Sequence, residues 1–183
     1  MRVPRTFVFV DISGFTNFTN ENGDDAAGRL LASWRAVTRE VASETGVRIA
    51  KWLGDGCMIV AVDQRDAITF ALELQKRSGA ACAPLSIRVG MASGLALLFE
   101  GDDYIGTAVN MAARLCDAAG SFEVIIPSEH IENLPEGVIM TPHEPMSLRG
   151  INEAIPVVSL TGEATNAARN DTGELWTRSP FVL

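Results

Sequence analysis

The sequence predicts an α+β fold: a ferredoxin-like βαββαβ core followed by an additional helix and further strands. Runs rich in β-branched and aromatic residues alternate with stretches whose apolar residues have helical spacing. Two of the runs are separated by a short turn containing Gly-Asp-Gly, which is a hairpin signal. In such a core the helices are expected to cover one face of an antiparallel sheet.

The first elements follow from these patterns. Thr6 to Val10 is a short run typical of a strand buried on both faces. From Asp24 a helical pattern begins, and Gly46 is expected to end it. The apolar positions of this helix are Ala27, Leu30, Leu31, Trp34, Val37 and Val41.

The hairpin and the second half of the core come next. Val47–Trp52 and Cys57–Val62 are expected to be strands joined by "LGDG", because glycine accepts the positive φ of a tight turn. Ala67, Phe70, Ala71 and Leu74 indicate a second helix. Leu85–Ala92 is expected to be the fourth strand.

The remaining residues extend the core. A short connector leads to a helix in "TAVNMAARLCDAAG", with one stripe formed by Val109, Ala112, Ala113 and Cys116. Phe122–Ile126 and Ile155–Leu160 are expected to be closing strands. We therefore expect one domain over residues 1–161, followed by a tail at 162–183 that is loose or docks on a partner.

Charge and composition limit the class of protein. The 183 residues include 15 Lys and Arg against 23 Asp and Glu, giving a net charge of −8, which argues against a nucleic-acid partner. No apolar run approaches the ~20 residues of a membrane span. Cys57, Cys82 and Cys116 form no CxxC pair and are expected to be reduced core residues of a cytoplasmic protein.

Two aspartates are expected to face each other. Asp11 follows the first strand and Asp55 lies in the hairpin turn, and these elements should be neighbours in the sheet. Two nearby carboxylates repel, and oxygen ligands suit Mg²⁺ or Mn²⁺. A structural role is the alternative for each: Asp11 can cap loose N–H groups, and Asp55 can simply serve the turn.

The residues after Asp11 add a possible phosphate site. Ile12, Ser13, Gly14 and Phe15 are expected to form a tight turn whose successive backbone N–H groups suit phosphate oxygens. Magnesium is commonly held by one or two carboxylates together with substrate phosphates, so a nucleoside triphosphate is the natural ligand.

Four motifs, taken together, resemble the class III adenylyl cyclases. They are "FVFVDISGFT", "KWLGDG", "RVGMASG" and "DYIGTAVNMAAR", they occur in family order, and they span roughly residues 5 to 160. The connector before the last motif is short, as in the family branch with a reduced dimerisation arm. Asn110 and Arg114 in the last motif lie at i, i+4 and share one helical face.

The resemblance implies a homodimer with two symmetric sites at the interface. Asp11 and Asp55 of one protomer would bind two divalent metal ions, and Asn110 and Arg114 of the other would orient the ribose and stabilise the transition state. The product would be cyclic AMP, formed by attack of the ribose 3′-hydroxyl on the α-phosphate with release of pyrophosphate. Arg149 stands where relatives often carry a lysine that touches the triphosphate.

The same resemblance assigns the base-reading residues, Lys51 and Asp103. Asp103, rather than Asp102, lies seven residues before Asn110 and is therefore chosen. Adenine offers an acceptor at N1 and a donor at N6, so a lysine and an aspartate complement it, whereas guanine reverses both groups. ATP is therefore the expected substrate.

Three alternatives remain open at this point. The chain could be a cyclase-like module that binds ATP or a partner without turnover, or it could be a guanylyl cyclase. A palm-like polymerase or diguanylate cyclase shares the core pattern, but this chain has no "GGDEF"-type hairpin and no basic surface for a template.

Overall fold

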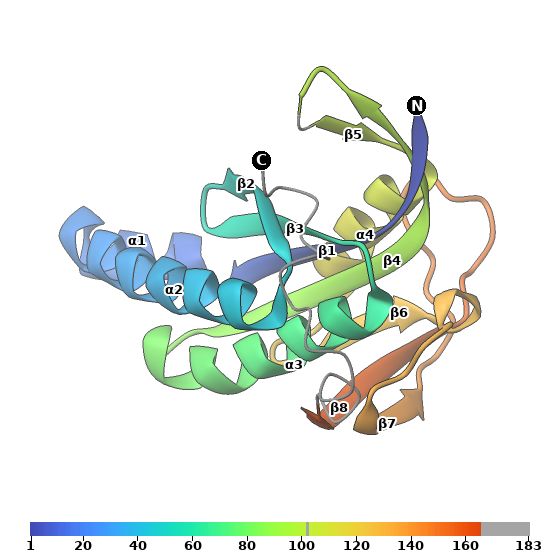
Figure 1. The fold of residues 1–183 in the computed structure, drawn as a ribbon. Helices are drawn as coiled ribbons and strands as arrows, with labels where there is room; N and C mark the ends of the chain where they lie inside the picture. Colours follow the sequence, from blue (N-terminus) through green and yellow to red (C-terminus); the bar gives the residue numbers. More distant parts are fainter. Residues whose placement is uncertain (102, 166–183) are drawn as a thin grey trace.

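The computed structural model describes residues 1–101 and 103–165, and within them the fold is α+β, as predicted. Eight strands form one sheet in the order β2-β3-β1-β4-β6-β8-β7, with β5 paired to β4 alone (Figure 1). The strands are β1 (Arg2–Ser13), β2 (Arg48–Leu53), β3 (Gly56–Ala61), β4 (Ser86–Phe99), β5 (Asp103–Ile105), β6 (Val124–Pro127), β7 (Glu136–Pro142) and β8 (Val157–Thr165). The helices are α1 (Phe15–Asn22), α2 (Asp24–Thr45), α3 (Gln64–Ala81), α4 (Thr107–Ala118) and the short 3₁₀ turn η1 (Ser128–His130).

The centre of the sheet is β1, which pairs antiparallel with β3 on one side and β4 on the other. Its side chains alternate between two separate cores, as the pleat of a strand requires. Val8, Val10 and Ile12 pack in the core beneath α2 and α3, and Phe7 packs in the second core. The expected strand at Thr6–Val10 is therefore confirmed and is longer at both ends.

Helices cover both faces of the sheet, which corrects the expectation of a single covered face. α2 and α3 lie on one side, and α4 lies on the other, against β4 and β1 (Figure 1). The sheet is also not wholly antiparallel, because β6 runs parallel to β4. The buried residues of α4 are Ala108, Met111, Ala112, Leu115 and Cys116, so the expected stripe is rotated away from Val109 and Ala113.

A glycine lets α4 approach the sheet. A Cβ at Gly90 of β4 would overlap the backbone at Ala112 and Cys116. Gly94 lies four residues further along β4 on the same face, and a Cβ there would lie 3.0 Å from the Cβ of Ala108. The helix that carries Asn110 and Arg114 is therefore seated directly on β4 backbone.

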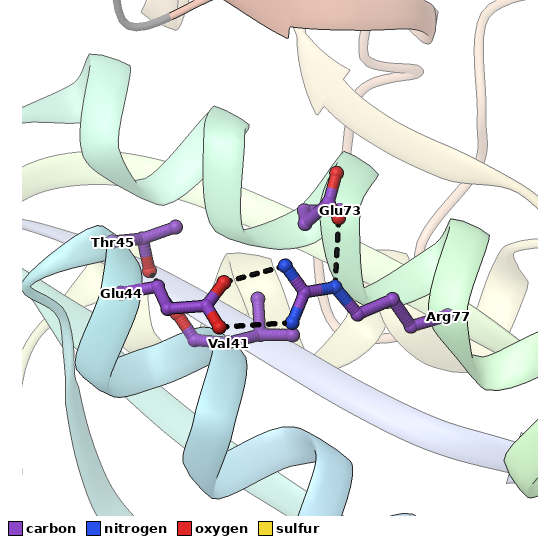
Figure 2. A network of polar contacts seen from close by, with 5 residues as sticks. All are labelled: Val41, Glu44, Thr45, Glu73 and Arg77. Carbon is purple, nitrogen blue, oxygen red and sulfur yellow. Dashed lines mark hydrogen bonds and ion pairs between the residues drawn. The ribbon is translucent and has the colours of Figure 1, made fainter.

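The two helices of the other face are joined by an arginine. Arg77 of α3 donates from Nη1 and Nη2 to the two carboxylate oxygens of Glu44 on α2, at 3.1 and 2.5 Å (Figure 2). Its Nε donates to Glu73 at 2.7 Å, one turn earlier on α3. A bidentate pair of this kind fixes the relative position of two helices as well as their separation.

Several elements differ from the sequence prediction. The expected connector after Ala92 is the rest of β4 followed by β5, and this β4–β5 hairpin extends from the body of the molecule (Figure 1). α1, η1 and β7 were not predicted. The helices over 24–45 and 64–81, the β2–β3 hairpin and the strands β6 and β8 are confirmed within a few residues.

The last strand of the sheet extends past residue 161. β8 runs to Thr165 and pairs with β7 there, so the first residues of the expected tail belong to the sheet. The remainder of the tail, 166–183, lies outside the described residues. The three cysteines are buried and free, as predicted. Within the described ranges, no helix is both long and apolar enough to cross a membrane.

Candidate active site

The strand register brings Asp11 and Asp55 to one cleft. Asp11 is paired with Gly56 across the β1–β3 ladder, so the residue before Gly56 lies beside it. The N–H of Ile12 donates to the carbonyl oxygen of Asp55 at 3.3 Å, which ties the turn to β1. Both aspartates line a cleft of about 360 Å³ between this end of the sheet and α4.

Gly56 permits this close approach. A Cβ at position 56 would lie 2.6 Å from the carbonyl oxygen of Val10 and 3.4 Å from a carboxylate oxygen of Asp11. Its role therefore differs from the sequence prediction: the positive φ of the turn, 67°, belongs to Gly54, whereas Gly56 provides space.

Arg88 is a member of the site that the sequence reasoning missed. Its Nε and Nη2 both donate to Oδ2 of Asp11, at 2.9 and 2.6 Å, and its Nη1 donates to the carbonyl oxygen of Asp117 at 2.8 Å. Asp11 and Arg88 are direct partners in the β1–β4 ladder. Arg88 opens the "RVGMASG" motif, so the signal was present, but using it requires the register of two strands far apart in sequence.

The environment raises the pKa of Asp11 above its ordinary value. Burial disfavours the charged carboxylate, and the neighbouring Asp55 adds to that effect. The hydrogen bonds and positive charge of Arg88 act in the opposite direction and offset part of it. The cleft therefore holds a carboxylate whose ionisation is stabilised by any additional cation placed there.

The donor set of the cleft fits a hard divalent cation. Two carboxylates, Asp11 and Asp55, converge with room around them, and oxygen donors are what Mg²⁺ and Mn²⁺ prefer. No group of three or more His, Cys, Asp or Glu side chains among residues 1–101 and 103–165 could form an all-protein metal cage. Any ion held here must therefore take further ligands from water or from a substrate.

The predicted phosphate turn has a different form. Ile12 and Ser13 continue β1, and the N–H of Ile12 is already paired with Asp55, so the four residues do not form one nest. Gly14 alone makes the turn, with φ 81°, and Phe15 begins α1. The free N–H groups at this point are those of the first helical turn, whose positive end also attracts phosphate.

Lys51 and Asp103 are brought together by the fold although they are 52 residues apart. Nζ of Lys51 on β2 donates to Oδ1 of Asp103 on β5, and both side chains are about half exposed. A cationic donor and an anionic acceptor therefore stand side by side at the surface. Neither residue lines the cleft of Asp11 and Asp55.

Asn110 and Arg114 of α4 do not line that cleft either. Asn110 is exposed, and Arg114 is half-buried on the same helical face. Gly150 lies against the guanidinium of Arg114, because a Cβ built there would be 3.4 Å from its Nη2. Arg149, the residue before Gly150, is exposed in the adjoining loop.

The sequence profile of the adenylate and guanylate cyclase catalytic domain matches residues 4–162, which is most of the chain. The chain belongs to this family. Its members are the class III cyclases, as the motifs indicated, and the family uses divalent metal ions. The match includes every site residue discussed above.

Curated relatives share about a third of their aligned residues with this cyclase domain. An uncharacterized protein of Mycobacterium tuberculosis is 31% identical over 83% of the chain, and an adenylate cyclase of Streptomyces coelicolor is 30% identical over 69%. The chain spans only 40% and 33% of the lengths of these two proteins.

Solved structures show the same fold. The adenylyl cyclase CyaB from P. aeruginosa superposes with a TM-score of 0.80 at 24% identity, covering 94% of this chain and 98% of that one. The guanylate cyclase domain of RhGC from Catenaria anguillulae, in complex with GTP, gives a TM-score of 0.76 at 20% identity, covering 89% and 99%. An adenylyl cyclase and a guanylate cyclase domain both have this fold, so the fold does not distinguish ATP from GTP as the substrate.

Proposed function

We propose that this cyclase domain is an adenylyl cyclase that converts ATP to 3′,5′-cyclic AMP and pyrophosphate. The observation that carries the proposal is the pairing of Lys51 with Asp103. The lysine can donate to N1 of adenine, and the aspartate can accept from the N6 amino group. Guanine would meet a donor with its N1–H and an acceptor with its O6, leaving both pairs unsatisfied.

Asp11 and Asp55 are proposed to hold two divalent ions, Mg²⁺ or Mn²⁺, with the triphosphate completing their ligand shells. When bound, the ions lower the pKa of the ribose 3′-hydroxyl, polarise the α-phosphate and neutralise the leaving pyrophosphate. Arg88 keeps the Asp11 carboxylate oriented, and the N-terminal turn of α1, which follows Gly14 and begins at Phe15, offers N–H groups to the phosphates. Ile12 contributes through its bond to the turn of Asp55.

The second half of the site is proposed to come from another copy of the chain. Lys51, Asp103, Asn110 and Arg114 do not line the cleft that holds the two carboxylates. A second protomer related by a twofold axis supplies them, and the arrangement produces two equal sites. Asn110 then orients the ribose, Arg114 neutralises charge that develops on the phosphoryl group, and Arg149 contacts the triphosphate beside it.

The β4–β5 hairpin supports such a dimer. Large apolar side chains on it are exposed, and the most open, Leu95 and Ile105, expose 59% and 57% of their surfaces. Phe99 at the end of β4 exposes 46%. An apolar group of this kind on one projecting hairpin is typical of a surface that another protein covers.

The proposal is tested by steady-state production of cyclic nucleotide from ATP and from GTP, each with Mn²⁺ and with Mg²⁺. Cyclic AMP that forms in the wild type and disappears in Asp55→Ala supports it. Preference for GTP under the same conditions would make the domain a guanylyl cyclase. Binding of ATP without turnover of either nucleotide would make it a binding module, and either result would overturn the proposal.

A further inference from the structure

An arginine outside the cleft holds the turn that carries Asp55. Arg35 lies on α2, and its Nη2 donates to the carbonyl oxygen of Gly54 at 2.7 Å. Gly54 is the first of the two turn residues between β2 and β3, and Asp55 is the second. The hydrogen bond therefore ends one peptide unit away from the residue proposed to bind metal.

The same guanidinium is part of a stack on Trp52. Cζ of Arg35 lies 4.8 Å from the centroid of the Trp52 ring, and Cζ of Arg39 lies 5.2 Å from it. The ring of Trp34, which is fully buried, meets Trp52 edge-on at 5.8 Å. The end of β2 is thus packed on one face of α2. The guanidinium of Arg35 contacts both the Trp52 ring and the Gly54 carbonyl of the turn.

The two proposed metal carboxylates are supported in different ways. The side chain of Asp11 is held directly by Arg88. The side chain of Asp55 makes no hydrogen bond within residues 1–101 and 103–165, so its position depends on the backbone of its turn. That backbone is fixed from β1, by Ile12 N–H to the Asp55 carbonyl, and from α2, by Arg35 to the Gly54 carbonyl.

The hydrogen bonding of the Arg35 guanidinium is incomplete. Its Nε is buried and has no hydrogen-bond partner among the described residues. A buried donor left unpaired is destabilising, and such cases in native proteins call for an explanation. Here the guanidinium leaves Nε unpaired while Nη2 reaches the turn.

We propose that Arg35 is a positioning residue that sets the Asp55 carboxylate for divalent metal binding by fixing the Gly54 carbonyl. The inference rests on the proposed role of Asp55 in the cyclase site. Arg39 is a natural control because it lies one helical turn further along α2 and stacks on the same ring. In the described part of the chain it makes no hydrogen bond to the turn.

The test compares Arg35→Met with Arg39→Met. Binding of Mn²⁺ alone is followed by electron paramagnetic resonance of the free ion, and the urea midpoint of each variant is measured alongside. Arg35→Met is expected to weaken Mn²⁺ binding about tenfold, as changes to groups that support metal ligands do. Arg39→Met is expected to stay within about twofold of wild type, since it loses only a stacking contact.

Turnover gives a second readout. In Arg35→Met the Mn²⁺ concentration for half-maximal rate is expected to rise by a similar factor, and saturating Mn²⁺ is expected to restore most of the rate. A purely structural role would lower the rate at every Mn²⁺ concentration. Arg35→Lys keeps a charged donor without the planar fork, so its Mn²⁺ affinity should fall between those of wild type and Arg35→Met.

Equal Mn²⁺ affinity in an Arg35 variant and its matched Arg39 variant would overturn the inference. If Arg35→Met does not fold, Arg35→Lys against Arg39→Lys decides by the same criterion. Failure here is distinct from failure of the proposed function. A wild type that makes no cyclic nucleotide would refute adenylyl cyclase activity, whereas the Mn²⁺ comparison would still decide the role of Arg35.

Discussion

Asp11 and Arg88 face each other across the β1–β4 ladder, and two nitrogens of the arginine donate to a single carboxylate oxygen, Oδ2. Both side chains are 28% exposed, so the pair lies at the cleft wall and is partly shielded from water. The other carboxylate oxygen, Oδ1, is left for the cleft. Arg88 therefore orients Asp11 without consuming all of its capacity to bind a cation.

Asp11→Asn is expected to abolish cyclase activity while leaving the free energy of unfolding unchanged or slightly higher. Burial and Asp55 make the Asp11 charge costly, and an amide oxygen can still accept from Arg88. Urea unfolding and a cyclic AMP assay measure the two effects. Glu40→Gln, an exposed carboxylate change on α2, is the control and should alter neither property.

The stability of the metal-free protein should depend on pH through Asp11. Its pKa in the folded state is raised above 3.8, so ionisation of Asp11 costs folding free energy. Relative to Asp11→Asn, the wild type should be most stable below pH 3.8 and lose that advantage as pH rises through the raised pKa. Paired urea titrations across this range measure the difference, and a wild type that becomes more stable relative to Asp11→Asn as pH rises would contradict the assignment.

Gly56→Ala is expected to destabilise the protein by about 1–3 kcal/mol, because its methyl group would be forced against the Val10 carbonyl. Gly79→Ala is the matched control at an exposed position of helix α3, where nothing lies within 4 Å of the new methyl group. There alanine should stabilise by about 0.5–1 kcal/mol. Urea unfolding of both variants checks the opposite signs, and equal effects would refute the close approach at Gly56.

Lys51→Glu is expected to lower kcat/KM for ATP by at least about 100-fold, because a donor to adenine N1 is replaced by an acceptor. It also places a second carboxylate beside Asp103. Arg29→Glu, exposed on α2, makes the same change in charge away from the site and serves as control. Unaltered ATP kinetics in Lys51→Glu would remove the base-reading role from this residue.

The elements with strong local patterns were predictable from the sequence. The period of α2, its end at Gly46 and the β2–β3 hairpin all follow from residues near one another in the chain. The helix α1 was missed because it has only eight residues and only two of them, Phe15 and Phe18, are apolar, which is too few to show a helical period. β7 was missed because its side chains are almost all exposed and its strand character comes from pairing with β8.

The site was predictable where residues belong to motifs and less so where it depends on register. Asp11 and Asp55 could be expected to meet because the first strand and the β2–β3 hairpin are neighbours in a βαββαβ core. Arg88 could not be assigned, because its contact with Asp11 depends on pairing across 77 residues. The seating of α4 on the second face depends on Gly90, whose role appears only when helix and strand are docked. The sequence pattern places Arg35 in a helix, but its contact with Gly54 depends on how that helix packs beside the hairpin.

The central claim is that two carboxylates of one protomer act with Asn110 and Arg114 of another, and mixing two inactive variants tests it directly. Asp55→Ala and Arg114→Ala, each inactive alone, are combined in equal amounts and allowed to exchange subunits. Half of the dimers are then heterodimers with one intact site, so activity should return to about a quarter of the wild-type value. No recovery, with subunit exchange demonstrated by differently tagged chains, would contradict the shared site.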